Sequence, residues 1–521
     1  MVNLNKDLSQ SFNLKAVVGG NVRQTVNQSI SAATSGGMVV PGFFALANSK
    51  NTPAAPTEYY GRREVDGIYA NATLSYKELL TLDASLRRDQ SSTLPKSNNS
   101  YYYPSASLNF QFSKLLPDVK WLSHSKAWAN YAEVSGDAPI FSLANTYTSQ
   151  TPFNSQTMFS TPSTNNNPNL VPERQKQYEF GIESSFLKDR IGFNVAYYHA
   201  QQINQIMPAS VSTSTGFSTF YVNGGAIQNS GVEVSVNLVP VKTANFSWNM
   251  AINWSKNTQK VLSLYNGQPQ YVVASYQNAI RLVAKPGKPY QLQGTDYVYL
   301  NGQREIDANG YYMIASNAYS DLGTPNPDWI GGINNTFKYK NFAFSFLIDM
   351  RKGGSVYSLD MDYGSSSGLY PRTAGYNDLG NPVRSPLTND NKSGGIILKG
   401  VTSSGAANTV RIDESDINNG AFSFSSAYGE ADKEFVYDAS YIKLRELAIT
   451  YSIPSRVFGK GLSFVKGVDF SLTGRNLWII QKNLPYADPE QGQASGNASM
   501  GFQNGAYPTM RTFGAILKVK F

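Results

Sequence analysis

The sequence predicts an all-β protein, namely a large portion of an antiparallel transmembrane β-barrel. The first observation is strict period-two alternation. In residues 246–254 (FSWNMAINW) every second residue is large and apolar, and the residues between are polar or small. The second is that long and short connections alternate between about fifteen such strands, as extracellular loops and periplasmic turns do in outer-membrane barrels. We therefore expect one face of each strand to meet lipid and the other to meet water.

The candidate strands are runs of alternating apolar and polar residues along the whole chain. In one of them the apolar Phe180 and Ile182 alternate with the polar Glu179 and Glu183. In another, the apolar residues from Phe344 onward alternate with small or polar ones. The predicted strands lie near residues 2–6, 11–34, 57–76, 80–90, 101–113, 124–135, 173–187, 190–207, 226–240, 243–258, 328–340, 342–352, 437–453, 464–476 and 510–521.

The connections between these strands are of two kinds. Tight turns are predicted at Lys188-Asp189, at 240–243 and at Lys340-Asn341, where charge or proline interrupts two alternating runs. Long segments rich in Asn, Ser, Thr, Gly and Pro are expected to form extracellular loops; they lie near 136–172, 259–327, 353–436 and 477–509. The chain is thus expected to be one fragment of a single β-barrel domain over residues 1–521.

One strand changes phase. Ile442 and Leu444 are apolar at even positions, whereas Leu447 and Ile449 are apolar at odd positions. A β-bulge near Arg445-Glu446 would explain this change, because one extra residue restores the facing of the later side chains, so that the apolar ones stay on the same face. The alternative is an unbroken strand in which Ile442 and Leu444 lie above the lipid band and pack beneath loops.

Both ends of the chain lead to the expectation of an open or incomplete barrel. Residues 1–7 (MVNLNKD) contain neither a basic region nor an apolar run, so they are not a signal peptide. Counting strands back from Phe521 gives an odd number, whereas bacterial barrels have an even number. We expect that a signal peptide and upstream strands are missing from this chain.

Composition excludes several classes of protein. The 521 residues contain no Cys, which excludes disulfide frameworks and Cys-based metal sites. No apolar run approaches the 18 or so residues of a transmembrane helix. The formal charge is +8, but Lys and Arg are scattered singly, so nucleic-acid binding is not expected.

Catalytic motifs are absent, so we predict no enzyme activity, no catalytic residue and no cofactor. The only histidines, His124 and His199, lie in different strands, and His199 next to tyrosines suits an interfacial aromatic belt. Two acidic groups could bind Ca²⁺ but lack a full ligand set, so we predict solvated loop acids and no metal; they are Asp360 with Asp362, and Asp413 with Glu414 and Asp416. Residues 306–311 (IDANGY) are expected to form a turn between extended segments.

Several motifs resemble those of a known family. In the last third they are residues 438–446 (DASYIKLRE), 473–477 (TGRNL), Tyr507-Pro508, 511–513 (RTF) and the terminal Lys520-Phe521. Earlier matches are Asn169-Leu170 with Glu173, Asn229 with 231–233 (GVE), 326–329 (NPDW) with Gly331-Gly332, and 339–341 (YKN). In their order and spacing these residues resemble the SusC/RagA-type TonB-dependent outer-membrane transporters of Bacteroidetes. The first hundred residues match only weakly.

The resemblance implies a fold, partners and a location. It implies a 22-stranded barrel in the outer membrane, surrounded by membrane lipid, that imports an oligosaccharide or peptide. It also implies a SusD-like lipoprotein lid and a connection to TonB through a plug, which is expected to be missing from this chain. Two alternatives remain: a passive porin, and a secreted or surface β-protein that binds ligand without transport.

Two groups of residues are candidate functional sites. Tyr370, Arg372 and Tyr376 lie in a predicted loop and combine flat apolar faces with hydrogen-bond donors, so they are candidates for contact with the substrate or the lid. The terminal residues Phe513, Leu517, Val519 and Phe521 form an apolar stripe similar to the signal for insertion of barrels into the outer membrane, although Ile516 on the other face departs from the pattern. The alternative for this stripe is an ordinary edge strand.

Overall fold

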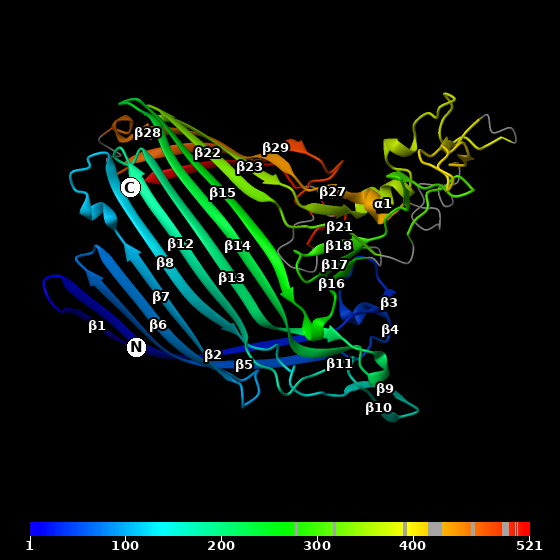
Figure 1. Ribbon diagram of the computed structural model, residues 1–521, viewed down its shortest axis with the longest axis horizontal. Coiled ribbons are helices and arrows are strands. Elements are labelled where there is room, and N and C mark those ends of the chain that lie inside the picture. The colour runs from blue at the N-terminus through cyan, green and yellow to red at the C-terminus, as the bar shows by residue number, and fades with distance from the viewer. Residues whose placement is uncertain are drawn as a thin grey trace. The chain divides into compact units, whose positions relative to one another are not determined.

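The computed structural model describes residues 1–276, 280–315, 319–388, 393–414, 430–459, 464–491, 500–505, 507 and 509–521. The protein is all-β, and its main element is a 16-stranded sheet (Figure 1). Within the described residues, no helix is long and apolar enough to cross a membrane.

Fifteen strands follow one another in the main sheet in chain order, and each pairing that the structure defines along this path is antiparallel. A sixteenth strand, β11 (Thr164–Asn165), pairs in parallel with β14. The fifteen are β1 (Val2–Asp7), β2 (Phe12–Ser31), β5 (Thr57–Tyr76), β6 (Leu80–Ser91), β7 (Ser100–Phe110), β8 (Leu122–Gly136), β12 (Glu173–Phe186), β13 (Ile191–Ser210), β14 (Thr219–Lys242), β15 (Phe246–Ser263), β22 (Trp329–Tyr339), β23 (Phe342–Lys352), β28 (Tyr441–Pro454), β29 (Gly467–Lys482) and β31 (Thr512–Lys520).

These fifteen strands correspond one to one with the fifteen predicted from alternation, with two corrections. The turn predicted at 240–243 begins later, because β14 continues through Pro240 to Lys242. The segment predicted as one strand over 437–453 is two, because Ala439 and Ser440 separate β27 (Val436–Asp438) from β28. The turn at Lys340-Asn341 is confirmed, since Tyr339 pairs with Phe342.

Aromatic side chains on one face explain why β15, β22 and β23 pair in this register. Trp248 lies opposite Phe337, which in turn lies opposite Phe344. The ring centroids of Trp248 and Phe337 are 5.5 Å apart, and those of Phe337 and Phe344 are 6.2 Å apart. Such cross-strand aromatic pairs stabilise a sheet, and a slip of one residue would separate them.

The phase change in β28 is a β-bulge, as the first of the two alternatives predicted. On β23, Leu347 pairs with Glu446 and the next residue, Ile348, pairs with Leu444, so Arg445 has no partner in this ladder. The pairing with β29 also shifts between Leu444 and Glu446.

The chain divides into two compact units. Unit 1 comprises residues 1–112, 127–180 and 200–226, and unit 2 comprises 113–126, 181–199 and 227–521. Unit 1 has a small core of Leu94, Tyr101, Ala138 and Leu170. The largest core of unit 2 joins residues of the long loops, including Ile280, Leu292, Tyr357 and Phe502.

The long loops contain more regular structure than the sequence predicted. A four-stranded sheet within residues 271–323 lies between β15 and β22 in the chain, and the described residues include one α-helix, which begins at Leu359. The loop strands are β3 (Ser35–Met38), β4 (Ser49–Asn51), β9 (Thr148–Phe153), β10 (Gln156–Ser160), β16 (Tyr271–Tyr276), β17 (Ile280–Ala284), β18 (Gln291–Gly294), β19 (Tyr299–Leu300), β20 (Gln303–Arg304), β21 (Ser320–Gly323), β24 (Ser355–Ser358), β25 (Ile396–Ile397), β26 (Arg411–Ile412), β27 and β30 (Phe502–Gln503); the α-helix is α1 (Leu359–Ser366). Short 3-10 helices lie at Leu46–Asn48, Phe112–Leu115, Thr213–Thr215, Tyr265–Gly267, Pro371–Thr373, Asp432–Phe435 and Ser455–Val457.

Candidate functional site

A polar basin of about 290 Å³ lies on the polar face of unit 1. Strand alternation places its residues together, because Asn21 and Arg23 of β2, Arg63 and Val65 of β5, and Arg87 and Asp89 of β6 are at odd positions in paired strands. Tyr101, Tyr103, Ser135, Gly136 and Asp137 complete the lining.

Two of the three arginines in this basin are held by carboxylates. Arg63 donates from Nε and Nη2 to the two oxygens of Asp137, both at 2.7 Å. Arg87 Nη2 is 2.8 Å from Asp89 Oδ1, and its Nε donates to the Tyr103 hydroxyl at 2.6 Å. The Asp89 and Asp137 carboxylates are largely shielded from solvent, so the two guanidinium groups that they bind are held in position.

Arg23 differs from the other two arginines. Its side chain is exposed, and among the described residues it has neither an ion-pair partner nor a hydrogen-bond partner. The basin therefore contains one positive charge that no carboxylate of the described residues balances.

Residues of the predicted motif Asn169-Leu170 with Glu173 make structural contacts in the same unit as the basin. Leu170 is fully buried and packs in one cluster with Tyr101. Asn223 donates to the carbonyl of Val171 and accepts from the backbone N–H of the same residue, at 2.7 and 2.9 Å. Glu173 accepts from the N–H of Ile206 at 2.6 Å. Leu170 thus supports Tyr101 of the basin lining, and Glu173 fixes the backbone at Ile206.

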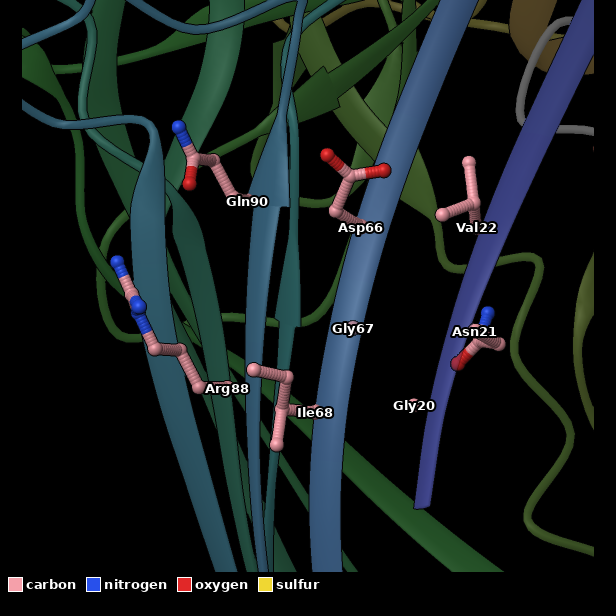
Figure 2. Close-up of a pocket in the computed structure, with 8 residues that line it drawn as sticks. All are labelled: Gly20, Asn21, Val22, Asp66, Gly67, Ile68, Arg88 and Gln90. Atoms are coloured by element: carbon pink, nitrogen blue, oxygen red, sulfur yellow. The ribbon is translucent and has the colours of Figure 1, made fainter. Parts of the chain in front are cut away.

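A second hollow, of about 460 Å³, lies on the other face of the same strands (Figure 2). It forms where Gly20 lacks a side chain, between Val22, Ile68 and Arg88. Arg87 and Arg88 are consecutive residues, so their side chains leave β6 toward opposite faces. Arg87 therefore lies on the face of the sheet that carries the basin, and Arg88 lies on the opposite face.

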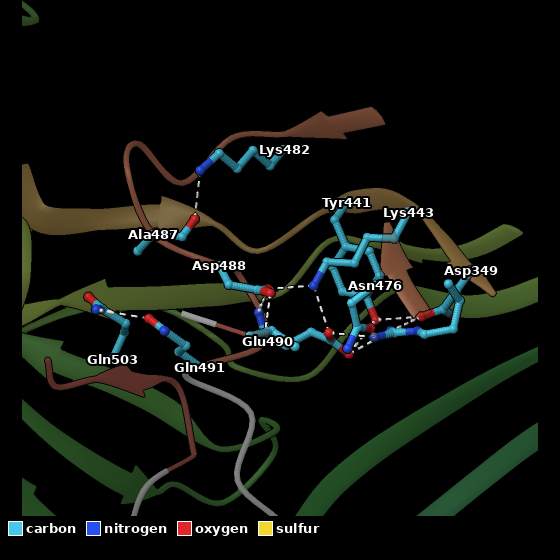
Figure 3. A network of polar contacts seen from close by, with 12 residues as sticks. Asp349, Tyr441, Lys443, Asn476, Lys482, Ala487, Asp488, Glu490, Gln491 and Gln503 are labelled. Atoms are coloured by element: carbon cyan, nitrogen blue, oxygen red, sulfur yellow. Dashed lines mark hydrogen bonds and ion pairs between the residues drawn. The ribbon is translucent and has the colours of Figure 1, made fainter. Parts of the chain in front are cut away.

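A buried network of ion pairs joins a long loop to strands of unit 2 (Figure 3). Lys443 is 3% exposed, and its Nζ contacts Asp488 and lies 2.6 Å from Glu490 Oε2. Arg445 donates to both oxygens of Glu490, at 2.7 and 2.8 Å, and pairs with Asp349. The bulge places Arg445 here, and the network ties residues 488–490 to β23 and β28.

Ion pairing in this network lowers the pKa of the Glu490 carboxyl group. Burial alone would raise the pKa of Glu490, but hydrogen bonds from Arg445 and Lys443 lower that pKa to about 2. Glu490 is therefore ionised throughout the physiological range of pH.

The predicted contact residues Tyr370, Arg372 and Tyr376 lie in different surroundings. The Tyr370 ring stacks on that of Tyr486, with centroids 4.7 Å apart. Arg372 forms an ion pair with the largely buried Glu430. The Tyr376 side chain is 78% exposed. The first two thus stabilise the loop, whereas the Tyr376 side chain is mostly exposed to solvent.

Two acids of the same loop region are buried and have raised pKa values. Burial raises the pKa of Glu430 to about 7, against the opposing effect of Arg372. Burial also raises the pKa of Asp362 to about 6, although a 2.5 Å hydrogen bond from the Tyr357 hydroxyl opposes this shift. The prediction that Asp362 is a solvated loop acid was wrong, because α1 packs its carboxyl against Tyr357.

The remaining predictions concern a turn, the acidic groups and a histidine. In residues 306–311 the turn is confirmed, with Asp307 Oδ1 accepting from the N–H groups of Asn309 and Tyr311, both at 2.9 Å. Among the described residues no cluster of three or more acidic or histidine side chains could hold a metal. Asp416 lies outside the described residues. His199 Nδ1 is hydrogen-bonded to the Ser230 hydroxyl at 2.9 Å.

The terminal stripe lies on β31 and just beyond it. Phe513, Leu517 and Phe521 are 76%, 66% and 78% exposed, and Val519 is 38% exposed. β31 pairs with β29 in a continuous ladder from Thr512 to Lys520. Its role as an insertion signal stays a prediction.

Comparisons with known proteins identify the family. The family profile described as "TonB dependent receptor-like, beta-barrel" matches residues 1–329. The chain belongs to this family. Its two-faced antiparallel sheet is therefore the sheet of a transmembrane β-barrel, in which the apolar face meets lipid and the polar face lines the interior. The polar basin lies on the interior face of this TonB-dependent receptor-like barrel, and the hollow of Figure 2 lies on the outward face.

Curated relatives and solved structures are similar over most of the chain. TonB-dependent receptor P26 of Formosa agariphila is 25% identical over 97% of this chain and 51% of its own length. TonB-dependent receptor SusC of Bacteroides thetaiotaomicron is 25% identical over 89% of the chain and 44% of its own length. The alignment with the structure of the RagAB peptide transporter covers 100% of this chain and 54% of the transporter chain. The sequence identity is 19% and the TM-score is 0.78, which supports the fold. The chain thus spans about half the length of the curated relatives that it matches.

The sequence did not predict the polar basin or the ion-pair network. The partners of Lys443 are more than 40 residues away in the chain, and alternation gives no information on such distances. One signal was available: Lys443 and Arg445 are charged residues inside a predicted strand, where charge requires a partner.

Proposed function

We propose that this chain forms wall and loops of an outer-membrane importer for an oligosaccharide or peptide, which works with a SusD-like lid and takes energy from TonB. Membership of the TonB-dependent receptor-like family carries the proposal. The name of the RagAB peptide transporter supports a peptide, and the resemblance of the sequence motifs to the SusC/RagA type supports a partner of the SusD type.

Two features of the structure agree with import through the interior of a barrel. The polar face has a basin lined by arginines, carboxylates and two tyrosines, which provides hydrogen-bond donors and acceptors for a polar solute. An adjoining hollow of about 300 Å³ shares Arg87 and Tyr103 with it and also contains Tyr69 and Asn71. A solute that moves along this face would replace its hydrogen bonds to water with hydrogen bonds to these side chains.

The loops are proposed to meet the lid or the substrate. Tyr376 is the best placed of the three candidates, since its ring is mostly exposed, whereas Tyr370 is stacked on Tyr486. We therefore expect Tyr376→Ala to weaken contact without disturbing the loop, and Tyr370→Ala to disturb the loop itself.

Uptake in cells tests the function. The gene that contains this sequence is deleted and then restored, and growth on oligosaccharides and on peptides is compared. Loss of growth on one class of solute, and loss of the same growth on removal of TonB, supports import. Unchanged growth on both classes contradicts it. Unchanged lid and substrate affinity in the Tyr370→Ala, Tyr376→Ala double variant would remove these residues from the proposal.

A further inference from the structure

The polar basin of unit 1 has the composition of an anion site. Its lining carries three arginines and two carboxylates, and each carboxylate already engages one arginine. Arg23 is the remaining cation, exposed and without a partner among the described residues. An exposed guanidinium in a concave site offers paired N–H donors that match the two oxygens of a carboxylate.

The two engaged arginines also favour a negative ligand. Asp137 holds Arg63 by two hydrogen bonds, and Asp89 with Tyr103 holds Arg87. Their side chains remain 33% and 27% exposed, so each keeps donors that face the basin. Because these two cations are fixed before the ligand arrives, they add little to the conformational entropy lost on binding.

Two tyrosines of the lining indicate what kind of group lies beside the acid group of the ligand. Both tyrosines line the basin; the partly buried Tyr103 stacks on the buried Tyr101, with ring centroids 6.1 Å apart, so Tyr103 provides the accessible ring. Flat aromatic surface beside a cation suits the apolar face of a sugar ring or the backbone of a peptide that ends in an acid group.

We propose that this basin binds a carboxylate on the imported solute, with Arg23 as the direct partner and Arg63 and Arg87 as flanking cations. This inference rests on the proposed import function, and it narrows the solute to an acidic one. A uronic-acid unit and the C-terminus of a peptide provide the same carboxylate, so both sources are to be tested.

Equilibrium binding to the full chain in detergent tests the site. The acid probes are trigalacturonate and N-acetyl-trialanine, and the neutral counterparts are maltotriose and N-acetyl-trialanine amide. We expect at least one acid probe to bind about tenfold more tightly than its neutral counterpart, and its affinity to fall as salt is added. Which acid probe binds identifies the source of the carboxylate.

Matched variants separate the site from the fold. Arg23→Gln should weaken binding of the acid probe about tenfold, and Arg23→Lys should restore part of it. Arg88→Gln is the control, because Arg88 is on the opposite face of the wall. Unchanged heat-modifiable gel mobility of each variant shows that it has folded.

Three results would overturn the acidic site: no binding of either acid probe, equal binding of acid and neutral probes, or undiminished binding by Arg23→Gln. The measurement needs neither TonB nor a lid. Import of a neutral solute by cells, together with no acid binding, would therefore overturn this inference and leave the proposed function in place.

Discussion

Lys443 shows how single residues hold a loop against the wall. Its ammonium group is buried between Asp488 and Glu490, and Arg445 occupies the other side of Glu490. A buried charge is tolerated only when it is paired and hydrogen-bonded, so each member of this network depends on the others.

Replacing Lys443 by Ala should therefore be strongly destabilising. Asp488 would lose its buried cation, and the free energy of unfolding should fall by about 3–5 kcal/mol. Denaturant titration of the chain in detergent measures this change. Lys338→Ala on β22 is the control and should change the same free energy by less than about 0.5 kcal/mol. Equal effects of the two substitutions would contradict the role of the network.

Glu430 makes the stability of its loop depend on pH. Its pKa is about 7 in the folded protein and near 4.5 ordinarily, so the folded state binds more protons between these values. Stability of the loop should then fall as the pH rises from about 4.5 to about 7 and be level above that. Hydrogen-exchange protection of β24 and α1 measures it, and Glu430→Gln should flatten the profile. A profile that keeps its slope in Glu430→Gln would assign the dependence to another group.

At the scale of elements, alternation predicted the wall because it is a local property. Each strand of the main sheet carries its own apolar and polar faces, and the bulge at Arg445 was visible as a change of phase. The loop sheets were not predicted, since strands of two to six residues such as β25 and β16 are too short to show a period. The basin was not predicted because alternation gives the face on which a side chain lies but not which residues of neighbouring strands lie opposite one another.

Close packing between strands explains one glycine of the family motifs. A Cβ at Gly231 would lie 2.5 Å from the carbonyl oxygen of Lys256 and 2.5 Å from the Tyr198 hydroxyl. Gly231→Ala should therefore force the strands apart and cost about 1–3 kcal/mol of unfolding free energy. Gly375→Ala is the control, because no atom lies within 4 Å of the position that its Cβ would take. Denaturant titration distinguishes them, and equal stability would show that the strand can adjust at Gly231.

At the scale of the whole molecule, the main sheet has one face suited to lipid and one suited to water. The aromatic ladder through Phe337 and Phe344 belongs to the first face, and the arginine basin belongs to the second. The apolar face anchors the chain in the membrane, whereas the polar face is proposed to guide a solute. A soluble surface protein would not need an apolar face of this extent.

Spin labels on β23 in lipid bilayers test the two-faced membrane wall most directly. Labels at Phe344 and Ser345 occupy consecutive positions whose side chains point to opposite faces. The label at Phe344 should be accessible to oxygen dissolved in lipid, and the label at Ser345 to a water-soluble nickel chelate. Equal accessibility of both labels to the nickel chelate would contradict a membrane wall.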